Sequence, residues 1–268
     1  MNPSTLLGML GGIVLLASII AFSSQDLDVY LNLPGLGIVL GGTIAATLLS
    51  YPLHEVIRVF RNFLLVMRKE RYHYREDMNE IVDVARLWFA GDLAAVQNRL
   101  DQTRNPYLRT GVQLVIDDTP IEDISDLLQW RVARMRAKEQ AEAQVFRTMA
   151  TYAPAFGMLG TLIGLINMLF ATKTSDFGII ATNLGVALIT TFYGIIFANL
   201  LFRPIAIKLE RRTEERVMLM NLVLEGVTLM RKGRSPAYIR ETLNSFMENH
   251  ADELRQERLS GKNRQARR

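Results

Sequence analysis

Four long apolar runs, none with an acidic, basic or histidine residue, divide this chain of 268 residues. An α-helix needs about 20 apolar residues to cross a hydrocarbon core that is ~30 Å thick. The runs, at 5–22, 33–51, 149–172 and 177–202, approach or exceed that length. The first lacks a basic leading segment and a small-x-small cleavage site, so we expect a retained helix and not a signal peptide. The pattern predicts an all-α membrane protein with four transmembrane helices.

Basic residues flank these runs on one side of the membrane. They are frequent after the second run, before the third and after the fourth. The charged residues of the two short loops are only Asp26 and Asp28 in the first loop, and Lys173 and Asp176 in the second. Because basic loops stay in the cytoplasm, we expect both termini and the middle segment to be cytoplasmic. The predicted domains are a first transmembrane hairpin (1–51), a cytoplasmic helical domain (52–147), a second transmembrane hairpin (148–207) and a cytoplasmic helix with a basic tail (208–268).

Helical periodicity recurs in the segment between the two hairpins. Apolar spacing predicts helices over Met78–Phe89, closed by Gly91, over Leu93–Leu100 and over Leu108–Val115. The sequence Thr119–Pro120–Ile121–Glu122 then combines an N-cap, a proline at the first helical position and a capping-box glutamate. One helix is predicted from this start into the third run, because no stop signal intervenes.

The fourth run is also predicted to continue as a helix, through Pro204 towards Gly233. The two long helices are either a rigid stalk or a lever moved by events inside the membrane, and pattern alone leaves both open. The basic, polar tail at 255–268 is expected to be disordered.

The runs contain hydroxyl, amide and glycine groups in place of ionisable ones. Ion carriers usually need an ionisable group at membrane depth, so any such group would have to come from another chain. Hydroxyls can line a polar ion path or can simply join helices by hydrogen bonds. The polar residues are Thr161 and Asn167 in the third run, and Thr182, Asn183, Thr190, Thr191, Tyr193 and Asn199 in the fourth.

Glycine and proline mark further positions in the runs. Gly37–Gly41 and Gly160–Gly164 are both GxxxG motifs, which predict close helix packing. Pro154 begins the third run and Pro204 follows the fourth. Each proline removes a backbone hydrogen bond and bends the helix, so each is a candidate hinge or a static kink.

Composition excludes several kinds of site. The chain has no cysteine, which excludes disulfides, thiolate catalysis and cysteine-ligated metals. His54, His73 and His250 match no metal-ligand spacing. Nucleotide-binding and hydrolase motifs are missing, so neither enzymatic activity nor a bound cofactor is expected. The net charge of +4 reflects the basic residues beside the runs, and nucleic-acid binding is not expected.

Several segments resemble the MotA/PomA family of flagellar motor stator proteins, and the resemblance covers nearly the whole chain. Residues 152–165, YAPAFGMLGTLIGL, resemble the third-helix signature of that family, and residues 186–194, VALITTFYG, resemble its fourth-helix signature. Shorter matches are Leu6–Gly8, Val39–Thr43, Asn105–Gly111 and Phe202–Ala206.

The resemblance implies a torque-generating stator subunit that conducts protons or sodium ions in the bacterial inner membrane. It implies a pentamer of this chain around a dimer of a single-span MotB/PomB-like partner, which supplies the ion-binding aspartate. The expected ion path contains Thr161, Thr190, Thr191 and Tyr193, and Pro154 and Pro204 are expected to couple ion flow to movement. The coupling ion is left open.

The resemblance also implies that the cytoplasmic domain pushes on the rotor protein FliG. Members of the family usually carry a basic pair before a glycine and a glutamate just after it. Here the segment reads ARLWFAGDLAAVQ over residues 85–97, which departs from that pattern. The residues expected to face the rotor are Arg86, Asp92, Arg99, Asp101 and Arg104.

Two alternatives remain. One is an ExbB/TolQ-like proton-channel subunit that energises another envelope or defence system, although such subunits usually have three spans and an extracytoplasmic amino terminus. The other is a non-conducting membrane scaffold.

We predict that Pro154→Ala leaves membrane insertion intact and abolishes torque, because a regular helix there would remove the expected hinge. The measurement is the swimming speed of cells with this variant as their sole stator subunit, compared at equal amounts in the membrane. Unchanged speed would show that Pro154 is not a hinge.

Overall fold

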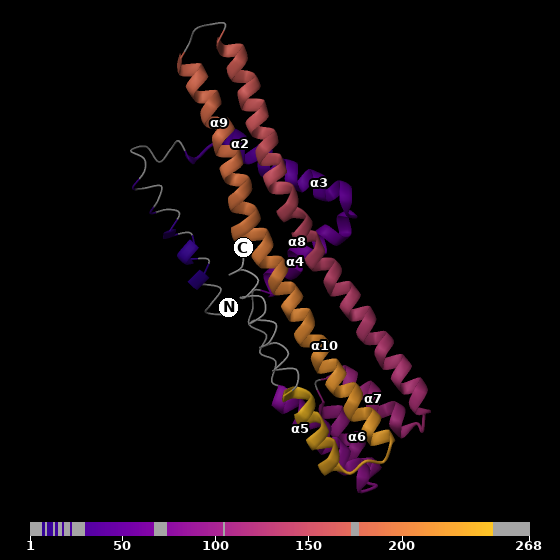
Figure 1. The fold of residues 1–268 in the computed structure, drawn as a ribbon. Coiled ribbons are helices and arrows are strands. Elements are labelled where there is room, and N and C mark those ends of the chain that lie inside the picture. The colour runs from indigo at the N-terminus through magenta and orange to yellow at the C-terminus, as the bar shows by residue number, and fades with distance from the viewer. Residues whose placement is uncertain are drawn as a thin grey trace, which may run out of the picture. The chain divides into compact units, whose positions relative to one another are not determined.

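The structure, a computed structural model, describes residues 30–66, 74–103, 105–172 and 177–248, together with isolated positions between 7 and 22. Every regular element in these ranges is helical, which confirms the predicted all-α class for the described residues (Figure 1). The chain forms two compact units. The first contains residues 1–70 and 138–212, and the second contains residues 71–137 and 213–268.

Long helices carry most of the first unit. Its elements are α2 (Leu33–Leu36), the π-helical segment η2 (Gly37–Gly41), α3 (Gly42–Ser50), α4 (Leu53–Val66), part of α8 (Ile121–Ala171), α9 (Phe177–Ile196), the π-helical segment η4 (Phe197–Phe202) and the start of α10 (Arg203–Arg231). Among the residues that the structure describes, three helices are long and apolar enough to cross a membrane: Leu33–Ser50, Ile121–Ala171 and Phe177–Arg231. The predicted span at 5–22 and both hairpin loops lie largely outside the described residues, so the layout of four spans stays a prediction.

Small residues bring α8 and α9 into backbone contact, as their GxxxG spacing predicts. A Cβ atom on Gly164 would lie 2.7 Å from Ala187 Cβ and 2.8 Å from the Asn183 carbonyl oxygen. A Cβ atom on Gly160 would lie 2.6 Å from Thr190 Cβ. These distances are shorter than van der Waals contact, so only glycine allows the two helices to approach this closely.

Close packing is also predicted at the second GxxxG motif, Gly37–Gly41, and this prediction is wrong within the single chain. A Cβ atom on either glycine would meet nothing within 4 Å, whereas one on Gly42 would lie 2.2 Å from the Phe156 ring. The segment Gly37–Gly41 is π-helical. Its wider turn changes which residue faces α8, so the contact falls one residue beyond the motif.

The second unit is built from three short helices and the ends of two long ones. Its elements are α5 (Tyr74–Phe89), α6 (Leu93–Gln102), α7 (Pro106–Ile116), the first part of α8, the last part of α10 and a final helix over 236–248. The three short helices confirm the predicted ones. Helix α6 begins at the predicted residue, α7 two residues earlier and α5 four residues earlier. Asp92 and Asn105 cap α6 and α7 by accepting hydrogen bonds from backbone N–H groups.

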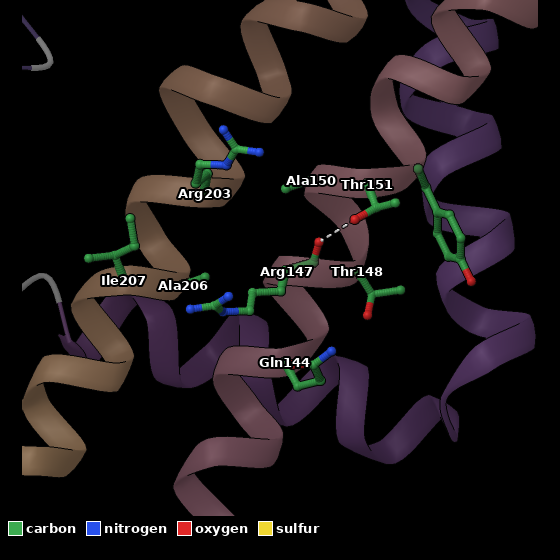
Figure 2. Close-up of a pocket in the computed structure, with 9 residues that line it drawn as sticks. Gln144, Arg147, Thr148, Ala150, Thr151, Arg203, Ala206 and Ile207 are labelled. Atoms are coloured by element: carbon green, nitrogen blue, oxygen red, sulfur yellow. Dashed lines mark hydrogen bonds between the residues drawn. The ribbon is translucent and has the colours of Figure 1, made fainter. Parts of the chain in front are cut away.

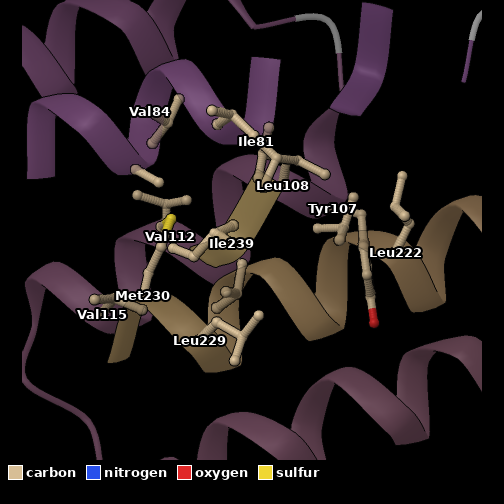
Figure 3. Close-up of a cluster of buried hydrophobic side chains, with 14 of the residues drawn as sticks. Ile81, Val84, Tyr107, Leu108, Val112, Val115, Leu222, Leu229, Met230 and Ile239 are labelled. Carbon is tan, nitrogen blue, oxygen red and sulfur yellow. The ribbon is translucent and has the colours of Figure 1, made fainter. Parts of the chain in front are cut away.

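One buried apolar cluster holds the second unit together. Ile81 of α5, Leu108 and Val112 of α7, Leu222 of α10 and Ile239 of the final helix are at most 1% exposed (Figure 3). Tyr107 also enters this cluster, and its hydroxyl donates to the Leu128 carbonyl at 2.9 Å. Burial raises the pKa of Tyr107, so the phenol stays a neutral hydrogen-bond donor.

The two long helices are continuous, as predicted. Helix α8 begins at Ile121, one residue after the predicted start, and passes Pro154 without a break. The carbonyl of Pro120 accepts the first helical bond, from Ile124 N–H at 3.1 Å. Helices α9, η4 and α10 form one helical run that continues past Pro204. The run ends before Gly233, whose φ of 67° is in the left-handed region.

We predict that Gly164→Ala destabilises the protein by about 1–3 kcal/mol, the usual cost of overpacking, because its methyl group would meet backbone atoms of α9. Gly185→Ala is the matched control, since a Cβ atom there meets nothing within 4 Å. The thermal unfolding midpoints of the two variants in detergent measure the difference. Equal midpoints would contradict the described helix contact.

Candidate ion-path site between helices α8 and α9

Two threonine hydroxyls meet where α8 and α9 touch. Thr161 Oγ1 and Thr191 Oγ1 lie 2.5 Å apart. Thr161 Oγ1 also lies 3.0 Å from the Ala187 carbonyl oxygen and 3.1 Å from the Gly157 carbonyl oxygen, either of which can accept its one hydrogen. Thr191 lies 3.3 Å from the same Gly157 carbonyl. The result is a cluster of four oxygen atoms from two helices, in a segment with no ionisable side chain.

The close approach at Gly157 makes this cluster possible. A Cβ atom on Gly157 would lie 3.0 Å from the Thr190 carbonyl oxygen and 3.2 Å from Thr191 Cα. A larger residue would push α9 away and separate the hydroxyls. Both threonines are partly exposed, so the cluster reaches the surface of the chain. Hydroxyl and carbonyl oxygens are ligands for hard cations, and hydroxyls can also pass a proton.

The other two residues expected on the ion path occupy different surroundings. Thr190 is fully buried and donates to the Ala187 carbonyl at 2.8 Å. The Tyr193 hydroxyl donates to the Tyr30 carbonyl and accepts from Asn32 N–H at 2.9 Å, which attaches the start of α2 to α9. Within the single chain, Thr190 therefore shares the Ala187 carbonyl with Thr161 from a buried position, whereas Tyr193 lies apart from the cluster and holds α2 against α9.

The two prolines lie beyond the hydroxyl cluster, on the side towards α10. Pro154 is inside α8, and a Cβ atom on Gly194 of α9 would lie 3.1 Å from Pro154 Cα. Pro204 is the second residue after the π-helical segment Phe197–Phe202. A proline has no N–H to donate, and the wider π turn accommodates the loss of a regular bond. Both positions are therefore irregular points in otherwise continuous helices.

An open cleft of about 610 Å³ adjoins the prolines, between α8 and the start of α10 (Figure 2). Its lining includes Arg147, Thr151 and Tyr152 from α8, and Arg203 and Ile207 from α10. Thr151 donates to the Arg147 carbonyl at 3.1 Å.

Sequence reasoning missed the ion pair beside this cleft. Arg147 binds both carboxylate oxygens of Glu210. The hydrogen bond from Arg147 and the charge of Glu210 raise the pKa of the guanidinium group. The partners are far apart in sequence and follow no local spacing rule, so no pattern could have revealed the pair.

The residues expected to face the rotor lie in the second unit and are held by local contacts. Arg86 pairs with Asp83 at 3.7 Å, and the Asp92 carboxylate caps α6 by accepting from Ala95 N–H. The carbonyls of Arg99 and Asp101 accept hydrogen bonds from Thr103 and Arg109. Arg104 lies outside the described residues. These contacts do not test a rotor-facing role.

Comparison with known proteins points to one family. A model of the MotA/TolQ/ExbB proton channel family matches residues 99–222. Motility protein A of Borreliella burgdorferi is 29% identical over 247 residues, which cover 92% of this chain and 94% of the relative. Chemotaxis protein PomA of Vibrio alginolyticus is 28% identical over 258 residues, which cover 94% of this chain and 96% of the relative.

A solved structure has the same fold. The flagellar MotAB stator complex from Bacillus subtilis matches with a TM-score of 0.81 and 25% identity, over 91% of this chain and 95% of the matched chain. The apolar helices, the glycine-lined contact and the signatures around Pro154 and Thr191 agree with these likenesses. The chain is thus similar, over more than nine-tenths of its length, to stator proteins of the MotA/PomA family.

Proposed function

We propose that this flagellar stator subunit supplies the hydroxyl side of an ion path whose ionisable group comes from another chain. The observation that carries the proposal is the Thr161–Thr191 cluster, which gathers four oxygen atoms at the surface of an apolar hairpin. The runs at 149–172 and 177–202 contain no acid or base. Hydroxyls can support a partly dehydrated cation or a proton, but they need a nearby carboxylate to bind it strongly.

The partner proposed for this role is a single-span MotB/PomB-like protein with an aspartate in its span. The proposal is supported by the match to a MotAB complex. We propose a pentamer of this chain around a dimer of the partner. The chain is a multi-pass inner-membrane protein, and both termini are proposed to be cytoplasmic because basic residues flank the apolar runs on that side. The conducted ion is H⁺ or Na⁺.

Coupling to rotation is proposed to use Pro154 and Pro204. Both prolines lack the N–H of a regular helical hydrogen bond, and both lie in helices that continue into the second unit. The second unit is proposed to act on the rotor protein FliG, with Arg86, Asp92, Arg99, Asp101 and Arg104 as candidate contacts. The curated relatives are motility proteins, which favours the stator over an ExbB/TolQ-like channel or a scaffold.

Deletion of the gene tests the stator role directly. We expect cells with no other stator to assemble flagella but not to swim, and expect swimming to return when the chain and its partner are expressed together. Normal swimming of the deletion strain would contradict the proposal.

Loss of either cluster hydroxyl is expected to slow the motor. A hydrogen bond to a charged group contributes about 1.5–3 kcal/mol, so Thr161→Ala or Thr191→Ala should lower ion flux about ten-fold or more. Thr→Ser at either position keeps the hydroxyl and should retain most of the flux. Thr182→Ala is the control, because that exposed hydroxyl bonds only the Gly178 carbonyl of its own helix among the described residues. Equal flux in Thr161→Ala, Thr191→Ala and the Thr182→Ala control would exclude the cluster from the ion path.

A further inference from the structure

Helix α8 and the continuous α9–α10 run are held together at two levels within the first unit. At the first level, a Cβ atom on Gly194 would lie 2.7 Å from the Ala153 carbonyl oxygen, so the two backbones touch. At the second level, Arg147 of α8 binds Glu210 of α10. Its Nη2 lies 2.7 Å from Glu210 Oε2, and its Nε donates to the other carboxylate oxygen.

Pro154 lies at the first level, and Pro204 lies between the two levels. In α8, Pro154 is about two helical turns beyond Arg147 and adjoins the Gly194 contact. In the other helix, Pro204 lies between Gly194 and Glu210. The cleft of about 610 Å³ occupies the space between the helices at this height, and in Figure 2 the Arg147 side chain extends from α8 towards α10. The two helices are therefore joined at Pro154 and again at the Arg147–Glu210 pair, and the cleft opens between these two levels.

The geometry of the ion pair suits a positioning role more than a stabilising one. The side chains of Arg147 and Glu210 are 56% and 28% exposed, and exposed ion pairs contribute little to folding. The bidentate contact, however, fixes both the distance and the relative orientation of a planar guanidinium and a planar carboxylate. A lysine ammonium would keep the charge and lose this orientation.

We propose that the Arg147–Glu210 pair is a strut that makes α8 and α10 move as one body beyond the membrane. Because the helices are joined at Pro154 and again at Arg147–Glu210, a change of angle of α8 at Pro154 must be matched by one of the other helix at Pro204, which lies between the two joins. The pair thereby coordinates the two hinges. This inference rests on the proposed stator function, because it assigns a mechanical role to residues that do not touch the ion path.

The test separates ion flow from torque in cells with this chain as their sole stator subunit. We expect Arg147→Ala and Glu210→Ala to lower bead rotation speed under load about five-fold or more, in the range of ordinary coupling between sites. Ion flux and the amount of protein in the membrane should stay unchanged. The exchanged pair, Arg147→Glu with Glu210→Arg, should restore rotation, and Arg147→Lys should restore it only in part. Arg211→Ala is the control, because Arg211 is exposed beside Glu210 and makes no ion pair with a described residue.

A second test does not depend on the exchanged pair folding correctly. Because the chain has no cysteine, Arg147→Cys with Glu210→Cys can be joined specifically by a short bis-maleimide. Cross-linking should restore rotation if the pair acts as a fixed strut.

Normal rotation in both alanine variants would overturn the inference, as would failure of both the exchanged pair and the cross-link to restore rotation. Loss of flux together with rotation would also overturn it, because the pair would then act on the ion path. If the unaltered chain supports neither flux nor rotation, the stator role itself is wrong.

Discussion

The backbone contact between α8 and α9 is the constraint on which the rest of the membrane hairpin depends. Glycine at positions 157, 160, 164 and 194 lets the two helices approach until only backbone and small side chains separate them. In lipid, where apolar burial drives little association between helices, such contacts supply the packing. At this distance the Thr161 and Thr191 hydroxyls can share a bond, and Gly194 packs against Pro154. The candidate ion site and the candidate hinge are thus set by the same contact.

The absence of charge in the apolar runs gives the second constraint. An acid or base at membrane depth costs several kcal/mol unless it is paired or hydrated, and this chain carries none in residues 149–172 or 177–202. The hairpin can therefore be inserted without that cost. It can offer oxygen atoms to an ion but cannot hold or release a proton at neutral pH. The proposal that this chain supplies oxygen atoms and a partner supplies the ionisable group follows from this chemistry.

Much of the fold could be predicted from the sequence because helix signals are local. Proline and capping residues before α7 and α8, and Gly91 and Gly233 after α5 and α10, fix helix ends within a few residues. The α8–α9 contact followed from glycine spacing. Periodicity could not show that Thr190 and Tyr193 turn inwards, because apolar residues predominate throughout α9 and mark no single face. The π turn at Gly37–Gly41 and the Arg147–Glu210 pair depend on tertiary contacts, which no local rule encodes.

The central claim is that this chain forms only half of an ion path. Its most direct measurement is ion flux into liposomes that contain the purified chain, either alone or assembled with its single-span partner. We predict no flux above that of empty liposomes for the chain alone and a clear flux for the assembly, which disappears when the partner's intramembrane aspartate is replaced by asparagine. Flux through the chain alone, or flux that survives this replacement, would contradict the account.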